Sequence, residues 1–403
     1  MFRLWQAGNG DVEFDFLIVG AGIAGASLAD ALAPTSRVAL IEAEQQPGYH
    51  ATGRSAALFV PSYGTATFRA LARASAAFLQ APPAEFFPAP LLRARGALYV
   101  AQSDQQARFT STITAMRAAG ADIELLSAAA ARRRLPLLRP PYLTHAAFEA
   151  GVADIDVSAL LQGFLRRARA HGARVMLGAR LGAAARSQDA WHLEVSDERL
   201  RARVLVDAAG AWADPVAVAC GAMPLGLRAL RRTAALIDPP TGVAVGGWPA
   251  LFDVGEQFYL KPESGRLLIS PADEEPVTPG DAYPEDLTVA MAVDRIQRAL
   301  DIDVQRVAHR WAGLRTFAAD REPVIGFDPK VESLFWCAGQ GGCGIESAPA
   351  LARVAAALAR GEPVPADITA QGVSAAALSP ARFTPAAASS ASRVRAAESA
   401  YRS

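Results

Sequence analysis

The first clear hydrophobic pattern in the chain predicts a strand, a helix and a second strand. The apolar run FDFLIV covers 14–19, an amphipathic stretch from about 23 to 33 predicts the helix, and the run VALIE belongs to a second strand at 37–42. Strands that alternate with a helix over such a short distance are typical of a βαβ unit. The pattern therefore predicts an α/β domain that begins near residue 14.

Glycines occupy the turn between the first strand and the helix. They form the pattern G-x-G-x-x-G, and the predicted contacts at this turn are Gly20, Gly22, Ile23, Ala24 and Gly25. The first glycine permits a tight turn, the second lets a pyrophosphate approach the backbone, and the third lets helix and strand pack closely. Glu42, 22 residues beyond Gly20, suits an unmodified ribose. The strand, helix and acid together favour a dinucleotide site over an ordinary glycine turn, without choosing between NAD and FAD.

The stretch QQPGYHATGRSAALF, at 45–59, has neither the alternation of a strand nor the apolar stripe of a helix. In a plain NAD domain the second strand normally runs on into another helix, whereas here a loop rich in small and hydroxyl-bearing residues follows. Such a loop offers donors to a diphosphate and space for a flat isoalloxazine ring, so it favours FAD. The predicted contacts in it are His50, Thr52, Gly53, Arg54, Ser55 and Ala56.

Further apolar runs and the composition extend this interpretation. Short apolar strands are predicted at 96–102, 233–238 and 266–272, and 403 residues with 51% hydrophobic content can fill two lobes. Forty basic residues balance forty acidic ones, which argues against a nucleic-acid partner and favours small ligands. Three cysteines without a metal-ligand spacing predict neither a disulfide framework nor a metal site. We find no signal peptide or membrane span, and therefore expect a cytoplasmic protein.

Five motifs, in order, resemble the D-amino acid oxidase (DAO) family of FAD-dependent oxidoreductases. They are the glycine fingerprint, PGYHATGRSAAL, VLVDAAGAWAD at 204–214, WAGLRTFAADREPVIG at 311–326 and WCAGQGGCGIESAP at 336–349. Within the family they are most similar to the bacterial D-arginine dehydrogenases. The resemblance implies a Rossmann-like FAD domain from 1–88, 153–213 and 316–375, and a substrate domain on a mixed or antiparallel sheet from 89–152 and 214–315. Residues 376–403, rich in alanine and serine, are expected to form a flexible tail.

The resemblance also implies site residues. Further FAD contacts would be Ala209, Gly210, Gly341, Gly342, Gly344 and Ile345, and the FAD would be held non-covalently, although some related flavoproteins attach it through a histidine in the loop that contains His50. Arg315 and Arg232 would bind the substrate carboxylate, with Arg231 as a rival for the second position. Tyr63 and Tyr259 would bound the same site, and the backbone carbonyl of Gly342 would hold the substrate amine.

The implied reaction removes hydride from Cα of a D-amino acid to flavin N5, and the imino acid then hydrolyses to a 2-oxo acid and ammonia. An N-methyl amino acid oxidase of the sarcosine type and a non-enzymatic flavin-binding module remain alternatives, and the electron acceptor is open between oxygen, a quinone and others. The sequence departs from D-arginine dehydrogenase where that enzyme has an acid for the guanidinium. The resemblance places Ala97 where that enzyme has the acid and Leu58 where it has a histidine, and the matching pocket positions Ala250 and Phe252 are apolar. An apolar pocket predicts apolar or uncharged side chains, with Glu346 the one acid nearby.

Overall fold

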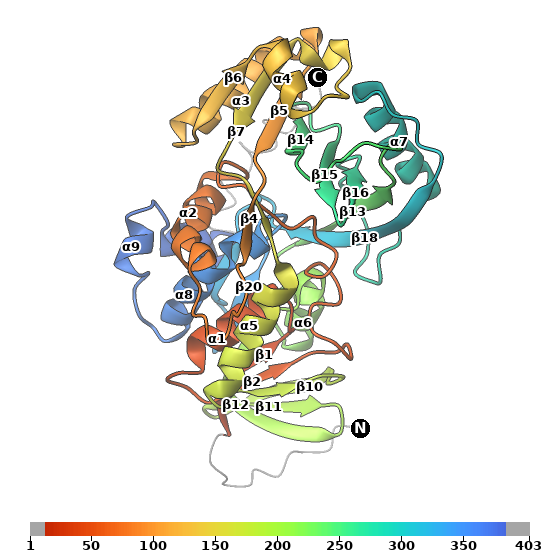
Figure 1. The fold of residues 1–403 in the computed structure, drawn as a ribbon. Coiled ribbons are helices and arrows are strands. Elements are labelled where there is room, and N and C mark those ends of the chain that lie inside the picture. The colour runs from red at the N-terminus through yellow and green to blue at the C-terminus, as the bar shows by residue number, and fades with distance from the viewer. Residues whose placement is uncertain (1–12, 384–403) are drawn as a thin grey trace.

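The computed structural model describes residues 13–383, and their strands form three sheets (Figure 1). The first sheet has the order β10-β11-β12-β1-β2-β9, with β20 beside β12 and β19 beside β20. Its strands are β1 (Phe14–Val19), β2 (Val38–Ile41), β9 (Arg174–Met176), β10 (Leu181–Ser187), β11 (Ala190–Val195), β12 (Glu198–Asp207), β19 (Val324–Phe327) and β20 (Leu334–Ala338). β1 pairs in parallel with β2 and β12, so the predicted βαβ unit is confirmed.

Helices cover this sheet because its central strands are apolar on both faces. Every residue of β2 is buried, and all of β1 is buried except Asp15. The helices around it are α1 (Ile23–Leu32), α2 (Ala66–Gln80), α5 (Val157–Ala170) and α8 (Gly344–Ala359), and α1 packs between α5 and α8. The predicted strand at 14–19 matches β1, and the predicted helix at 23–33 ends one residue earlier, at Leu32.

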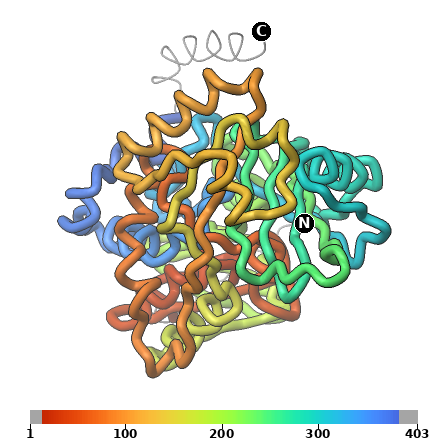
Figure 2. The backbone as a smooth tube through the Cα atoms, turned by 45° about the horizontal axis from the view of Figure 1, so that its top comes forward, coloured from red at the N-terminus to blue at the C-terminus, as the bar shows by residue number. Residues whose placement is uncertain are grey.

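The second sheet is larger and mostly antiparallel, and it forms the upper lobe in Figure 1. Its order is β17-β13-β16-β15-β14-β5-β7-β6, with β18 also paired to β13. The strands are β5 (Ala97–Ala101), β6 (Ile123–Leu126), β7 (His145–Glu149), β13 (Arg228–Ile237), β14 (Ala250–Asp253), β15 (Tyr259–Glu263), β16 (Arg266–Ser270), β17 (Glu275–Pro276) and β18 (Val307–Phe317). Figure 2 shows its two chain segments side by side, the orange-to-yellow one (β5–β7) next to the green one, joined where β5 pairs in parallel with β14.

A short third sheet lies where the chain crosses between the lobes. It consists of β3 (Leu58–Phe59), β8 (Ala153–Ile155) and β4 (Leu92–Ala94). The remaining helices are α3 (Gln106–Ala118), α4 (Ala128–Arg134), α6 (Ala213–Ala219), α7 (Asp286–Ala299), α9 (Ala366–Thr369) and α10 (Ala375–Leu378). The architecture is thus the expected one: a Rossmann-like lobe and a second lobe built on a mixed sheet.

The segment expected as a flexible tail, 376–403, begins with folded residues. Helix α10 ends at Leu378, which is fully buried, and Arg382 in the following 3-10 turn donates to Asp320 at 2.7 Å. Alanine and serine content therefore misled the prediction at 376–383, because one buried leucine and one ion pair hold the segment against the first lobe. Residues 384–403 lie outside the described part of the chain.

In 13–383 no helix is long and apolar enough to cross a membrane, and no cluster of metal-binding side chains occurs. Cys220, Cys337 and Cys343 are buried free thiols. Each cysteine is therefore part of the packing in the described structure, and none is cross-linked there.

The close packing of α1 on β1 gives a test of the glycine pattern. A Cβ on Gly25 would lie 1.9 Å from the carbonyl oxygen of Gly20, and backbone atoms there cannot move aside. We expect Gly25→Ala to lower the free energy of unfolding by about 3 kcal/mol, since overpacking against backbone must displace the helix from the strand. Thermal unfolding and the FAD content of the purified protein measure the effect.

Gly151→Ala is the matched control for Gly25→Ala. Nothing lies within 4 Å of a Cβ at Gly151. We expect its Tm and FAD content to equal those of the wild type. An equally stable Gly25→Ala variant would contradict the packing argument.

Candidate functional site

A cavity of about 1260 Å³ lies between the two lobes. Its lining comes from the glycine turn after β1, the loop after β2, the start of α8, and the strands β13, β14, β15 and β18. Pockets for single small ligands usually measure roughly 300 to 1,000 Å³, so this cavity has room for a dinucleotide and a small substrate together. The site therefore combines elements that are far apart in sequence.

The glycine turn and Glu42 form one end of the cavity. Gly20 has φ +102°, and a Cβ there would lie 2.6 Å from the carbonyl oxygen of Ala208. The carboxylate of Glu42 accepts from the amides of Ala21 at 2.8 Å and Glu44 at 3.0 Å, while the hydroxyl of Thr52 accepts from the amide of Ile23 at 3.0 Å. These bonds fix the acid beside the N-terminus of α1, where a ribose and a pyrophosphate would be bound next to each other.

Most of the predicted FAD contacts line the cavity. They are Gly20, Gly22, Ile23, Ala24, Glu42, His50, Thr52, Arg54, Ser55, Ala56, Ala209, Gly210, Gly341, Gly342, Gly344 and Ile345. Gly25 and Gly53 do not line it. Gly25 packs against Gly20, and Gly53 donates its amide to the carbonyl of Gly48 at 2.7 Å. These two glycines shape the turn and the loop and are not themselves part of the cavity wall.

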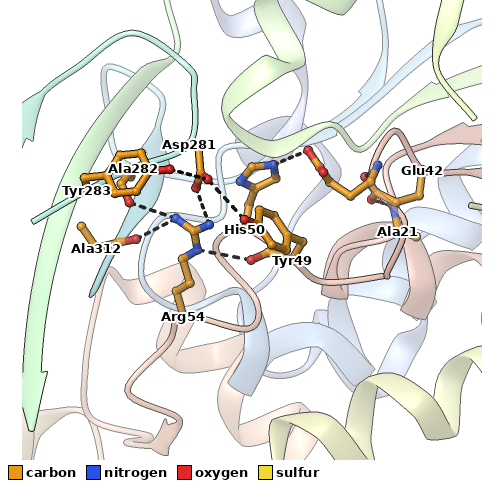
Figure 3. A network of polar contacts seen from close by, with 10 residues as sticks. Ala21, Glu42, Tyr49, His50, Arg54, Asp281, Ala282, Tyr283 and Ala312 are labelled. Atoms are coloured by element: carbon orange, nitrogen blue, oxygen red, sulfur yellow. Dashed lines mark hydrogen bonds and ion pairs between the residues drawn. The ribbon is translucent and has the colours of Figure 1, made fainter. Parts of the chain in front are cut away.

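Arg54 fastens the loop after β2 to the second lobe (Figure 3). Its guanidinium donates to the carbonyls of Ala282 at 3.0 Å, Ala312 at 3.1 Å and Tyr49 at 3.3 Å, and forms an ion pair with Asp281. Its own carbonyl accepts from the indole of Trp311 at 3.0 Å. Arg54 therefore links the loop after β2 to the second lobe through partners that are far away along the chain.

His50 makes a polar contact through a ring nitrogen and an aromatic contact through its ring. Its Nε2 lies 3.0 Å from a carboxylate oxygen of Glu44, and its ring lies 4.5 Å, between ring centroids, from that of Trp212 (Figure 3 draws the imidazole). The two contacts hold the imidazole against the acidic end of the loop.

The start of α8 closes the opposite side of the cavity. Gly341 has φ +52°, and a Cβ there would lie 2.3 Å from the ring of Phe317. A Cβ on Gly342 would lie 2.9 Å from a guanidinium nitrogen of Arg315. Glycine at 342 therefore lets this backbone and the Arg315 side chain occupy adjacent places in the cavity wall.

Strand pairing decides which arginines face the cavity. In the β13–β18 ladder Arg232 pairs with Gly313, and Leu230 pairs with Arg315. Since paired residues and residues two apart share a face of the sheet, Arg232 and Arg315 lie on one face and Arg231 on the other. Arg232 and Arg315 line the cavity, whereas Arg231 pairs with Glu285 at 2.6 Å and with Glu275. Arg231, the alternative to Arg232 in the sequence prediction, thus forms ordinary ion pairs away from the cavity.

The positive charge of Arg315 acts on Arg232 across the cavity. Burial lowers the pKa of Arg232, and the nearby charge of Arg315 lowers it further. Arg232 has one acidic partner, Glu274 at 3.0 Å, which Arg321 also binds at 2.9 Å. Tyr63 and Tyr259 line the cavity beside the arginines. An anion bound between the two guanidinium groups would relieve their repulsion, as a carboxylate does in bidentate pairs.

The side-chain pocket differs from its prediction at two positions. Leu58 and Phe252 line the cavity, but Ala97 and Ala250 are fully buried and are not among its lining residues. Tyr99, two residues along β5 from Ala97, lines it instead and stacks on Phe252 with centroids 5.5 Å apart. The phenol ring of Tyr99 therefore forms a part of the cavity wall for which the sequence predicted Ala97 and Ala250.

Sequence reasoning missed several residues of this site. They are Tyr99, Trp212, Glu274, Asp281 and Arg321. Strand alternation could have found Tyr99, because residues two apart on a strand share a face. Trp212 and Arg321 lie inside the quoted motifs at 204–214 and 311–326, which could have pointed to them. Glu274 and Asp281 carry no local signal, because their partners come from distant segments.

The chain belongs to the DAO family of FAD-dependent oxidoreductases, whose family model matches residues 15–358. The "uncharacterized oxidoreductase YurR" of Bacillus subtilis (strain 168) is 25% identical over 258 residues, covering 62% of this chain and 66% of that protein, just under two thirds of its length.

Solved structures show the same fold. Glycine oxidase from Geobacillus kaustophilus superposes with a TM-score of 0.77 at 22% identity, over 87% of this chain and 96% of that one. L-Proline dehydrogenase from P. horikoshii superposes with a TM-score of 0.78 at 18% identity, over 93% and 98%. These structures show the fold, while the family model places the chain among the FAD-dependent oxidoreductases, and its similarity to D-arginine dehydrogenase stays a prediction.

The residues present fit FAD. The positive φ of Gly20, the Glu42 carboxylate anchored beside the turn, and the length of the cavity from that turn to α8 suit a dinucleotide. The N-terminus of α8 points positive partial charge into the cavity, where a reduced flavin would carry negative charge.

The bridge made by Arg54 gives a test of the loop. We expect Arg54→Ala to raise the Kd for FAD about 10- to 100-fold, because the loop loses its bonds to the second lobe and each such charged bond is worth about 1.5 to 3 kcal/mol. Titration of the apoprotein with FAD, followed by flavin fluorescence, measures it. Arg298→Ala removes an exposed arginine paired with Asp294 and is the control, with an unchanged Kd. Equal Kd values for both variants would show that the bridge does not order the loop.

Proposed function

We propose that this protein oxidises the Cα–N bond of a D-amino acid to an imino acid, which water hydrolyses to a 2-oxo acid and ammonia. The observation that carries the proposal is the pair of arginines, Arg315 and Arg232, on one face of the β13–β18 ladder beside Gly342. The resemblance of the motifs to those of the D-arginine dehydrogenases supports the D configuration.

The arginines would bind the substrate carboxylate. A guanidinium fork matches a carboxylate in two parallel bonds, so the clamp fixes orientation as well as position. Tyr63 and Tyr259 bound the same space and would complete the cage around the carboxylate. With one end of the substrate fixed, rotation about a single bond remains for the rest of the molecule, and this loss of freedom supplies much of the catalysis.

The adjacent backbone would orient the amine. The backbone of Gly342 lies next to the Arg315 guanidinium, and its carbonyl, a hydrogen-bond acceptor, would hold the neutral amine while the clamp holds the carboxylate. Bound FAD supplies the two-electron acceptor for the hydride that leaves Cα. The proposal assigns no protein base to the Cα hydrogen, because orientation of the bond suffices.

We also infer that FAD is held without a covalent bond. The Nε2 atom of His50 is already engaged with Glu44, and this contact would be lost if the nitrogen bonded to the flavin. A cytoplasmic location and the division into FAD and substrate domains remain parts of the same proposal.

The pocket wall supports apolar or uncharged side chains. Leu58, Phe252 and Tyr99 contribute aliphatic and aromatic surface, and Tyr99 stacks on Phe252. A cationic side chain buried there without a charged partner would lose several kcal/mol of hydration. One fold relative is named for L-proline, whose amine is secondary, so a secondary N-alkyl amino acid is the second candidate substrate class.

Anaerobic reduction of the flavin by a panel of amino acids tests the proposed function. We expect fast bleaching by D-amino acids with uncharged side chains, and slow bleaching by their L enantiomers and by sarcosine. Fastest reduction by sarcosine or L-proline would move the assignment to the N-alkyl class. A flavin that no amino acid bleaches would favour a flavin-binding module without catalytic activity.

Replacing Arg315 tests the carboxylate clamp. We expect Arg315→Ala to cost about 2 to 5 kcal/mol in kcat/KM for every amino acid alike, because the variant leaves a desolvated carboxylate without its partner. The matched control is Arg231→Ala on the opposite face of the same ladder, for which kcat/KM should change far less in the FAD-loaded protein. A loss that depends strongly on the substrate side chain would place Arg315 in the side-chain pocket instead.

A further inference from the structure

A second group of buried polar residues in the cavity wall has no part in the carboxylate clamp. Glu346, in the first turn of α8, is only 4% exposed and lines the cavity. One of its carboxylate oxygens accepts from the amide of Val60 at 2.7 Å. Within the described residues no basic side chain forms an ion pair with it, although Arg315 is near enough to act on its charge. Burying a carboxyl group without a cationic partner lowers the stability of the fold. A buried acid at a cavity wall therefore points to a bound molecule that interacts with it.

A second acid stands behind the same wall. Glu149 lies directly opposite Ala97 in the β5–β7 ladder, and one of its carboxylate oxygens accepts from the hydroxyls of Ser62 and Tyr99, both at 2.8 Å. Ser62 and Tyr99 line the cavity, whereas Glu149 does not. The acid missing at Ala97 is thus present one strand away, but screened from the cavity by its two hydroxyl partners.

The surroundings of Glu346 decide its charge. Burial raises its pKa to about 8; the amide of Val60, the thiol of Cys343 and the charge of Arg315 act against this rise, and Glu149 adds to it. Burial also raises the pKa of Glu149 and that of Tyr99, the other titratable groups on this side. Near pH 7 the carboxyl of Glu346 is therefore mostly neutral, which agrees with a pocket for uncharged side chains.

We propose that Glu346 sets the side-chain charge preference of the enzyme: as a neutral acid it admits uncharged side chains, and as a carboxylate it binds the ammonium or guanidinium group of a basic one. The inference rests on the proposed oxidation of amino acids. Because binding of a cationic side chain requires the carboxyl to release its proton, affinity for that side chain should rise up to tenfold per pH unit below the pKa and level off above it. An uncharged side chain lacks this linkage.

The test compares D-lysine with D-norleucine, which has the same chain length up to the terminal methyl. We measure kcat/KM for flavin reduction with each from pH 6 to pH 9.5, where the lysine side chain stays protonated because its pKa is about 10.4. The two substrates share the α-amine and the carboxylate, so protonation of those groups largely cancels in the ratio. We expect the D-lysine to D-norleucine ratio to rise with pH and to level off above about pH 8.

Two variants separate this role from a structural one. Glu346→Gln keeps an oxygen that can accept from the Val60 amide but cannot ionise, so its ratio should be flat with pH. Glu149→Gln should keep the rise and move the levelling-off to lower pH, because the acid that raises the pKa of Glu346 is gone. FAD content and Tm establish that both variants are folded.

The possible results are distinct. A ratio that stays flat in the wild type, or that rises equally in Glu346→Gln, overturns the role of Glu346 while leaving the proposed oxidation standing. A flavin that no amino acid reduces overturns the proposed function, and this inference with it.

Discussion

The pairing of β13 with β18 is the constraint on which the rest of the site depends. It places Arg232 and Arg315 on the same face of the second sheet, toward the cavity, and turns Arg231 away toward Glu275 and Glu285. A slip of one residue would exchange the two faces and bring Arg231 into the cavity. The ladder runs in continuous register from Arg228–Phe317 to Leu236–His309, and its one irregularity falls at the far end, between Leu236 and Ile237.

Strand β18 also connects the parts of the site that come from the first lobe. Ala312 accepts from Arg54 of the flavin loop, Trp311 donates to the carbonyl of Arg54, and Thr316 accepts from the amide of Gly341 before α8. Strand β18 therefore anchors the loop after β2 on one side of the cavity, carries Arg315 in the middle, and holds the turn at Gly341 on the other side. Because these contacts are made along one extended strand, the distances between cofactor loop, clamp and turn are set by its regular rise.

The parts of this structure that the sequence predicts are those fixed by local pattern. The run FDFLIV and the three glycines determine β1, the turn and α1, because each depends only on neighbouring residues. The family motifs then place the arginines, and alternation along β13 would have separated Arg232 from Arg231. The pairing of Ala97 with Glu149 and of Arg54 with Asp281 could not be predicted, since each joins segments whose approach is decided by tertiary packing. The prediction of a flexible tail from alanine and serine content was wrong at 376–383 for the same reason, because contacts with distant residues hold this segment.

The charges along the cavity are arranged in an order that matches the chemistry of an amino acid. Two guanidinium groups at one end share a single acid, Glu274, with Arg321, so positive charge is left over for a carboxylate. The acids near these arginines are screened or favoured in their neutral form: hydroxyls bind Glu149, and burial raises the pKa of Glu346 to about 8. Had Glu346 been ionised, its charge would have neutralised part of the field of Arg315 and weakened the clamp. A raised pKa at Glu346 would therefore serve the proposed carboxylate clamp as well as the proposed side-chain pocket, because it leaves the positive field of the arginines undiminished.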